Sequence, residues 1–169
     1  MPKITPFLWF DDKAEEAAKF YTSVFKNSKL GAISRYGDAG PGPKGSVMTA
    51  SFSIEGMEFT ALNGGPHFKF NESVSFVVHC KTQQEVDEYW SKLLADGGQE
   101  SQCGWLKDKF GMSWQITPDR LVELITNKNA AKSQRAMQAM MQMTKIDIAK
   151  IEQAANQRKK LQASKKKLA

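Results

Sequence analysis

The sequence has 169 residues, which is long enough to bury a core without disulfides or a structural metal. It carries a net charge of +6, but residues 158–169 contain six basic side chains and no acidic one, so the rest of the chain is formally neutral. A neutral fold offers nucleic acid no basic patch, and a solvated basic tail is the favoured interpretation of 158–169. We therefore expect no nucleic-acid partner.

The chain also lacks the features of membrane and secreted proteins. Its apolar runs are far shorter than the ~20 residues that cross a bilayer, and its first residues do not have the layout of a signal peptide. Cys80 and Cys103 have neither metal-site spacing nor the density of a disulfide scaffold. We expect a cytoplasmic protein with two reduced thiols and no membrane contact.

The first half has the pattern of a strand, a helix and three strands. Residues 4–10 are apolar and β-prone, and apolar residues at helical spacing follow the acidic pair at 11–12. A strand at 30–36 leads into a loop at 37–45 that is rich in glycine and proline. A hairpin with a Glu-Gly turn completes the unit. Its predicted strands are 46–54 and 57–62.

The second half repeats this plan. A strand at 74–80 is followed by a helix whose start is marked by a capping box at 82–85. The helix ends at 96–98, and two extended segments follow. These segments are 99–107 and 112–117. The sequence therefore predicts an α+β fold of two tandem βαβββ modules, about 3–63 and 73–118, which form a cupped mixed sheet.

Helical patterns continue beyond Pro118. We expect a domain at 1–127, a C-terminal helical extension at 128–157 and a flexible basic tail at 158–169. Within the extension, a capping box at 144–147 predicts the start of the last helix. A stripe formed by Met137, Met140 and Met141 favours packing against the domain or a second subunit over a ligand groove.

Strand alternation predicts which side chains face away from the helices. Val74, Phe76 and Val78 form an apolar face that must lie under a helix, and the alternate positions of that strand are mostly polar. In the first strand, Phe7 and Trp9 fall on the open face. Two large aromatic side chains facing water require a ligand, a loop or another chain to cover them.

Three segments resemble the PhnB-like branch of the vicinal oxygen chelate superfamily. They are 5–10, 15–21 and 104–116, and the run Trp-Leu-Lys-Asp-Lys-Phe-Gly-Met-Ser-Trp-Gln at 105–115 is fairly specific. This branch often carries the name 3-demethylubiquinone-9 3-methyltransferase domain. Its relatives include glyoxalases, bleomycin-resistance proteins, fosfomycin-resistance proteins and extradiol dioxygenases. The resemblance covers about residues 3–127 and implies a U-shaped cleft and a homodimer in which strands from two modules line each site.

The resemblance also implies positions for a metal, which fall at Thr5, Ser73 and Gln115, with Thr60 as the fourth position. Hydroxyl and amide groups are poor ligands for the divalent ions of this superfamily, so we expect no metal and no cofactor. Methyltransferase activity is not expected either. The sequence lacks a Gly-rich turn between a strand and a helix that would hold a nucleotide-like cofactor.

These patterns favour a metal-free module that binds a small molecule. One alternative is a superfamily enzyme of lyase, transferase or dioxygenase type, with unusual metal ligands or with His79 as a general acid-base group. Another is a structural dimer whose helical extension recruits a protein partner. Whether the chain catalyses a reaction stays open. The predicted ligand-binding residues are Thr5, Phe7, Trp9, Ser73, Ser75, His79, Trp105 and Gln115.

Overall fold

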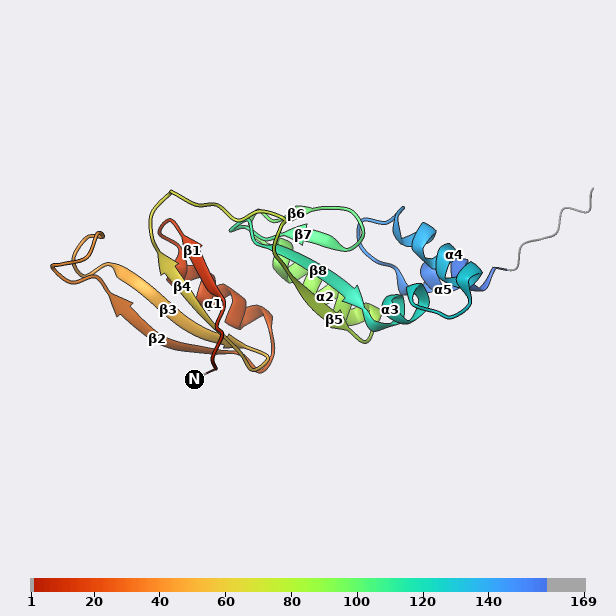
Figure 1. Cartoon of the computed structure of the whole chain (residues 1–169), viewed down its shortest axis with the longest axis horizontal. Coiled ribbons are helices and arrows are strands. Elements are labelled where there is room, and N and C mark those ends of the chain that lie inside the picture. Colours follow the sequence, from red (N-terminus) through yellow and green to blue (C-terminus); the bar gives the residue numbers. More distant parts are fainter. Residues whose placement is uncertain (1, 158–169) are drawn as a thin grey trace, which may run out of the picture.

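The computed structural model describes residues 2–157, and the predicted basic tail at 158–169 lies outside them. Two βαβββ modules follow one another along the long axis of the molecule, and three helices follow the second module (Figure 1). The predicted α+β fold with two modules and C-terminal helices is confirmed. No helix within 2–157 is long and apolar enough to cross a membrane.

Module one (residues 7–63) is a four-stranded sheet with one helix on one face. Strand β1 runs parallel to β4, and the other neighbours are antiparallel, in the order β1-β4-β3-β2. Glu55 and Gly56 join β3 to β4 with φ angles of 47° and 83°, the conformation that a tight hairpin turn requires. The elements are β1 (Phe7–Phe10), α1 (Ala14–Val24), β2 (Lys29–Arg35), β3 (Val47–Ile54) and β4 (Met57–Asn63).

Module two (residues 75–118) has the same plan, with the strand order β5-β8-β7-β6. Its helix begins after Thr82, whose side chain accepts a hydrogen bond from the amide of Glu85, as the capping pattern predicts. A turn at 101–104 divides the predicted extended segment 99–107 into two short strands. The elements are β5 (Ser75–Cys80), α2 (Gln83–Leu94), β6 (Gln99–Glu100), β7 (Trp105–Lys107) and β8 (Ser113–Pro118).

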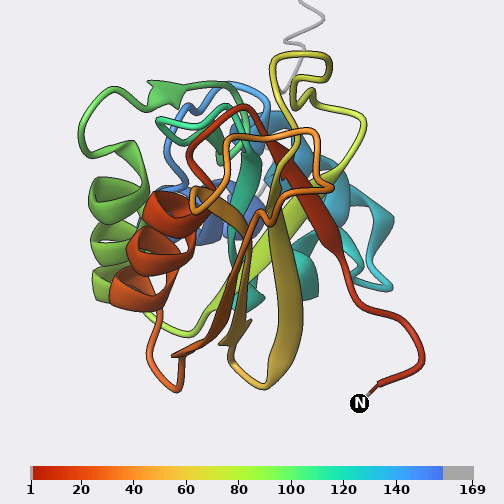
Figure 2. The ribbon, with the colours of Figure 1, turned by 90° about the vertical axis from the view of Figure 1, so that its left-hand side faces the viewer.

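Helices α1 and α2 contact each other on one side of the two sheets (Figure 2). Leu8 and Phe10 are buried beneath this helical layer, and Phe7 is exposed, as alternation predicts. Val74 is an exception, since it was expected to pack inward and is 63% exposed. The reason is that β5 begins only after Val74, so the residue belongs to the segment that links the modules.

A buried carboxylate joins the modules. Asp108 is 3% exposed, and its Oδ2 accepts hydrogen bonds from Tyr21 Oη and Trp114 Nε1, both at 2.8 Å. Its Oδ1 accepts from the amides of Phe110 (2.9 Å) and Met112 (3.1 Å). Burial raises the pKa of Asp108, and the four hydrogen bonds oppose this shift. Because Tyr21 lies on α1, this group holds module two against module one.

The two residues that follow make further contacts with module one. Lys109 Nζ lies 3.1 Å from Glu16 Oε1 of α1 and 5.1 Å from the centre of the Phe20 ring. The Phe110 ring packs edge-on against Phe10 and Phe20, with ring centres 5.8 Å and 5.7 Å apart. One hydrophobic core therefore extends through both modules.

The C-terminal helices form a second, smaller core. Helix α5 begins after Asp147, whose side chain accepts a hydrogen bond from the amide of Lys150, so the start predicted from a box at 144–147 was three residues early. Thr144 instead accepts a hydrogen bond through its carbonyl from the amide of Gly104. The helices are α3 (Asp119–Ile125), α4 (Ala130–Met140) and α5 (Ile148–Asn156).

The methionine stripe is only partly packed. Met140 contacts the second core, as the packing interpretation predicts. Met137 and Met141 are exposed on the surface of the extension. The stripe is therefore not a continuous interior face of α4.

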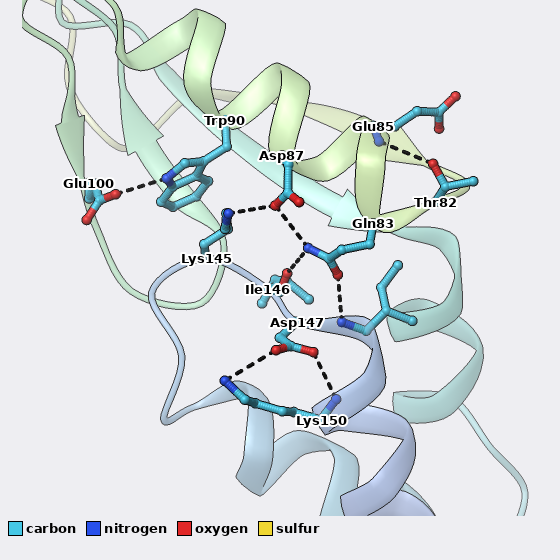
Figure 3. Close-up of polar contacts among 11 residues, drawn as sticks. Thr82, Gln83, Glu85, Asp87, Trp90, Glu100, Lys145, Ile146, Asp147 and Lys150 are labelled. Carbon is cyan, nitrogen blue, oxygen red and sulfur yellow. Dashed lines mark hydrogen bonds and ion pairs between the residues drawn. The ribbon is translucent and has the colours of Figure 1, made fainter.

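Polar contacts dock the extension onto α2 (Figure 3). Gln83 Nε2 donates to the carbonyl of Ile146 (3.1 Å), and Gln83 Oε1 accepts from the amide of Ile148 (2.9 Å). Lys145 Nζ lies 2.6 Å from Asp87 Oδ1 beside them. One amide side chain thus satisfies two backbone groups at the start of α5, which fixes the extension to module two.

We expect Asp108→Asn to lower the free energy of unfolding by about 2–4 kcal/mol, because an amide NH₂ would then face the Trp114 donor inside the core. Urea denaturation followed by circular dichroism measures this loss. Asp38→Asn is the matched control, since Asp38 pairs with Lys44 on the surface. An equal effect of the two changes would contradict the role assigned to Asp108.

Replacing Gln83 should loosen the extension without unfolding the modules. Gln83→Ala removes both hydrogen bonds to the start of α5, a loss of about 1–2 kcal/mol, so the α5 amides should exchange hydrogen about ten-fold faster. The exposed neighbour provides the control, Gln84→Ala. Unchanged exchange in α5 would show that other contacts dock the extension.

Candidate functional site

The eight predicted ligand-binding residues, all within the described part of the chain, fall into two groups on separate sheets. One group lies on or just before β1, and the other lies on β5, β7 or β8 or just before β5. Strands β1 and β5 each form one edge of their own sheet. The first group is Thr5, Phe7 and Trp9, and the second is Ser73, Ser75, His79, Trp105 and Gln115.

Trp9 is covered by the segment that links the modules. Its Nε1 donates to the carbonyl of Gly65 at 2.9 Å, and its ring packs edge-on against Phe68 with the ring centres 4.9 Å apart. A Cβ at Gly64 would overlap the Trp9 ring, so the segment can approach this closely because residue 64 is glycine. A loop therefore covers Trp9, which is one of the three kinds of cover that the sequence predicts. Phe7 is not covered in this way and is 59% exposed.

Three residues of the second group lie together. Gln115 Nε2 donates to Ser75 Oγ at 2.9 Å, and Trp105 is the β7 partner of Gln115, so its side chain shares the same face of the sheet. Ser73 is not part of this cluster. It precedes β5, and its hydroxyl bonds Asn71.

The donor set of the implied metal positions does not fit the ions of the superfamily. Thr60 lies between Phe7 and Ser51, and Gln115 lies between Val77 and Trp105, so no strand partner of these two positions is a carboxylate, an imidazole or a thiol. Residues 2–157 contain no group of three or more His, Cys, Asp or Glu side chains that could hold a metal ion. Neutral hydroxyl and amide oxygens bind such ions weakly.

A crevice of about 450 Å³ lies between the two modules. One wall consists of the β3–β4 turn and its flanking residues, and the other consists of β5 and the start of α2. Five aromatic side chains from both modules line it: Phe25, Phe59, Phe76, Tyr89 and Trp114. The polar lining residues are Glu55, His79, Lys81 and Glu85. This combination of apolar walls and few polar groups is typical of small-molecule sites.

The aromatic walls are packed against one another. Phe25 stacks on Tyr89 with ring centres 5.3 Å apart, which joins the end of α1 to α2. Phe76 contacts Phe59 and Trp114 at 5.4 Å each. Because these rings support each other across the module boundary, the crevice is formed before any ligand enters.

His79 is the single member of the eight predicted residues that lines this crevice. Its Nδ1 lies 3.4 Å from Asp119 Oδ1 at the start of α3, a contact that orients the ring. The neighbouring Cys80 thiol is buried, and burial, followed by the carboxylates of Glu85 and Asp119, raises its pKa to about 12. Cys80 is therefore not a nucleophile at neutral pH.

Carboxylates set the electrostatics of the crevice. Burial raises the pKa of Tyr89, and the carboxylates of Glu55, Glu85 and Glu88 raise it further. Glu85 Oε2 accepts from the backbone amide of Lys81 at 2.6 Å, which fixes its position. Tyr89 therefore lies in a negative electrostatic field.

A larger hollow of about 610 Å³ lies at one end of module one and contains none of the eight predicted residues. It is bounded by Tyr36, the loop at 41–43 and the segment 63–65. Its lining comes from module one and the linking segment, and it includes the carboxylates of Asp11, Asp12 and Glu15 and the imidazole of His67. Tyr36 is its single Phe, Tyr or Trp side chain. The crevice is the better candidate because aromatic side chains of both modules line it.

A family profile and a solved structure that resemble this chain carry the same family description. The sequence profile of the 3-demethylubiquinone-9 3-methyltransferases matches residues 2–117. A PhnB protein from Bacillus cereus, which bears that methyltransferase name, is 41% identical, and the match covers 69% of this chain and 99% of that chain with a TM-score of 0.63. Protein PA1353 from Pseudomonas aeruginosa shares the fold at 22% identity, with 70% and 98% coverage and a TM-score of 0.57. No curated protein matches the chain.

Proposed function

The chain belongs to the 3-demethylubiquinone-9 3-methyltransferase family, a PhnB-like group of the vicinal oxygen chelate superfamily, and on this basis we propose that it binds a small organic molecule between its modules. The observation that carries the proposal is the crevice of about 450 Å³, whose aromatic walls come from both modules. Such a volume suits a ligand of drug-like size, and the apolar walls gain free energy when the ligand displaces water.

Binding in the crevice needs no metal. Aromatic contact supplies affinity, and His79 with the nearby carboxylates supplies orientation. The family name refers to methyl transfer, but the sequence has no Gly-rich turn for a nucleotide-like methyl donor. We therefore propose binding rather than methyl transfer.

One observation favours a second function. Asp119 holds the Nδ1 side of the His79 ring, and His79 lines the crevice, so its second ring nitrogen could exchange a proton with a bound molecule. An enzyme of this kind would release a chemically changed ligand. His79→Gln would then abolish the change in the ligand while leaving it bound.

We also propose that two copies of the chain pair through their free strand edges. Phe7 on β1 and Val77 on β5 are 59% and 45% exposed, and each strand is an edge strand of its sheet. Val77 also lines the crevice, so a strand of the second copy paired with β5 would border the ligand site. Exposed apolar edge strands are normally covered in stable proteins. Pairing of β1 in one copy with β5 in the other would bring the two groups of predicted residues together, as the family resemblance implies.

Filling the crevice should prevent ligand binding. Met57 lines the crevice and is 52% exposed, so Met57→Trp adds a ring there at little cost in packing. Native mass spectrometry of the purified protein after incubation with a cellular metabolite extract should show a bound molecule, and Met57→Trp should lower its occupancy about ten-fold.

Met137→Trp is the control for this experiment, because Met137 is exposed on α4 and does not line the crevice. The fraction of Met137→Trp protein that carries the bound molecule should match that of the unaltered protein. Equal occupancy in Met57→Trp would place the ligand elsewhere, and the absence of any bound molecule would contradict a binding function.

A charge at the β1 edge should separate the two copies. Light scattering at micromolar concentration should give the mass of a dimer, and Phe7→Lys should give that of a monomer, because burying an unpaired ammonium opposes association. Met141→Lys alters an exposed apolar residue of the extension and should leave the dimer intact. A monomeric mass for the unaltered protein would refute the pairing.

A further inference from the structure

We propose that the crevice selects an organic cation, that is, an apolar group which carries a protonated amine or a quaternary ammonium. This inference rests on the proposed binding function and adds the charge of the ligand to it. Its basis is the combination of aromatic walls with two carboxylates, Glu55 and Glu85, that form no ion pair with Lys or Arg among the described residues.

The aromatic walls favour a cation over an anion. Phe25, Phe59, Phe76, Tyr89 and Trp114 all line the crevice. The face of an aromatic ring carries negative electrostatic potential, so a cation near it gains about 0.5–2 kcal/mol, whereas an anion is repelled. Phe25, Phe59 and Trp114 are almost fully buried in the core, so Phe76 and Tyr89 offer most of the aromatic surface that a cation would contact.

The two lining carboxylates add to the preference. Neither Glu55 nor Glu85 forms an ion pair with a Lys or Arg side chain among residues 2–157. Hydrogen bonds instead hold each in place, since Glu55 Oε2 accepts from Asn27 Nδ2 (3.2 Å) and Glu85 Oε2 accepts from the amide of Lys81 (2.6 Å). The hydrogen-bond partner of each carboxylate is therefore a neutral group and not a cation.

Two basic groups also line the crevice, and neither reverses its sign. Lys81 offsets one of the two lining carboxylates in formal charge, which leaves an excess of one negative charge. His79 lies beside Asp119, whose carboxylate offsets any charge on the ring. The raised pKa of Tyr89 is consistent with a net negative field, since Glu55 and Glu85 are among its causes after burial.

Three probes that share one ring system but differ in charge test the inference. They are 1-naphthylmethylamine, 1-naphthalenemethanol and 1-naphthoate, titrated into the full-length protein by isothermal calorimetry at neutral pH. The amine should bind about ten-fold more tightly than the alcohol, and the naphthoate should bind most weakly. Glu85→Gln and Glu55→Gln should each lower the affinity for the amine about three- to ten-fold and leave the affinity for the alcohol unchanged.

Glu58→Gln is the matched control, because Glu58 lies next to Met57 but does not line the crevice. It removes the same charge and should leave all three affinities unchanged. Should Glu85→Gln disturb the start of α2, seen as a lowered melting temperature, Glu55→Gln decides the outcome.

The outcomes separate this inference from the binding function. Loss of probe binding in Met57→Trp shows that the probe binds in the crevice. If the alcohol or the naphthoate binds there as tightly as the amine, the charge preference is wrong and the binding function stands. If none of the three probes binds, or if Met57→Trp affects none of them, both the inference and crevice binding are refuted.

Discussion

The buried carboxylate of Asp108 determines how the two modules sit against each other. It accepts four hydrogen bonds, and one of them comes from Tyr21 on the helix of module one. Neither module can supply all four donors alone. Because a carboxylate without its partners is costly inside a core, the modules can separate only by exposing Asp108 to water. The crevice, which requires both modules, depends on this constraint.

This arrangement gives a physical meaning to the run at 105–115, the part of the sequence that most resembles the family. Asp108 and Trp114 form the buried hydrogen bond, and Lys109 and Phe110 contact α1. The run therefore joins the modules. Its aromatic and charged residues resemble a site in the sequence, but most of them hold the fold together.

The local structure could be predicted from the sequence because its signals are local. Alternation identified the faces of β1, and a capping pattern identified the start of α2. The start of α5 was misplaced because Thr144 is engaged by Gly104, about forty residues away in the chain. Similarly, the sequence predicts that a ligand, a loop or another chain covers Trp9, and the path of the linking segment decides that it is a loop.

The crevice could not be predicted, because alternation assigns each side chain to a face but says nothing of the gap between modules. Phe76 was assigned to the apolar face beneath a helix. Phe76 and Trp114 do pack in the core, yet both also line the crevice. Trp114 connects the two roles, since its Nε1 donates to Asp108 while its ring lines the crevice wall. A molecule bound against Trp114 would contact both modules at once and stabilise the arrangement that Asp108 sets, because a ligand that binds only the folded form shifts the equilibrium towards it.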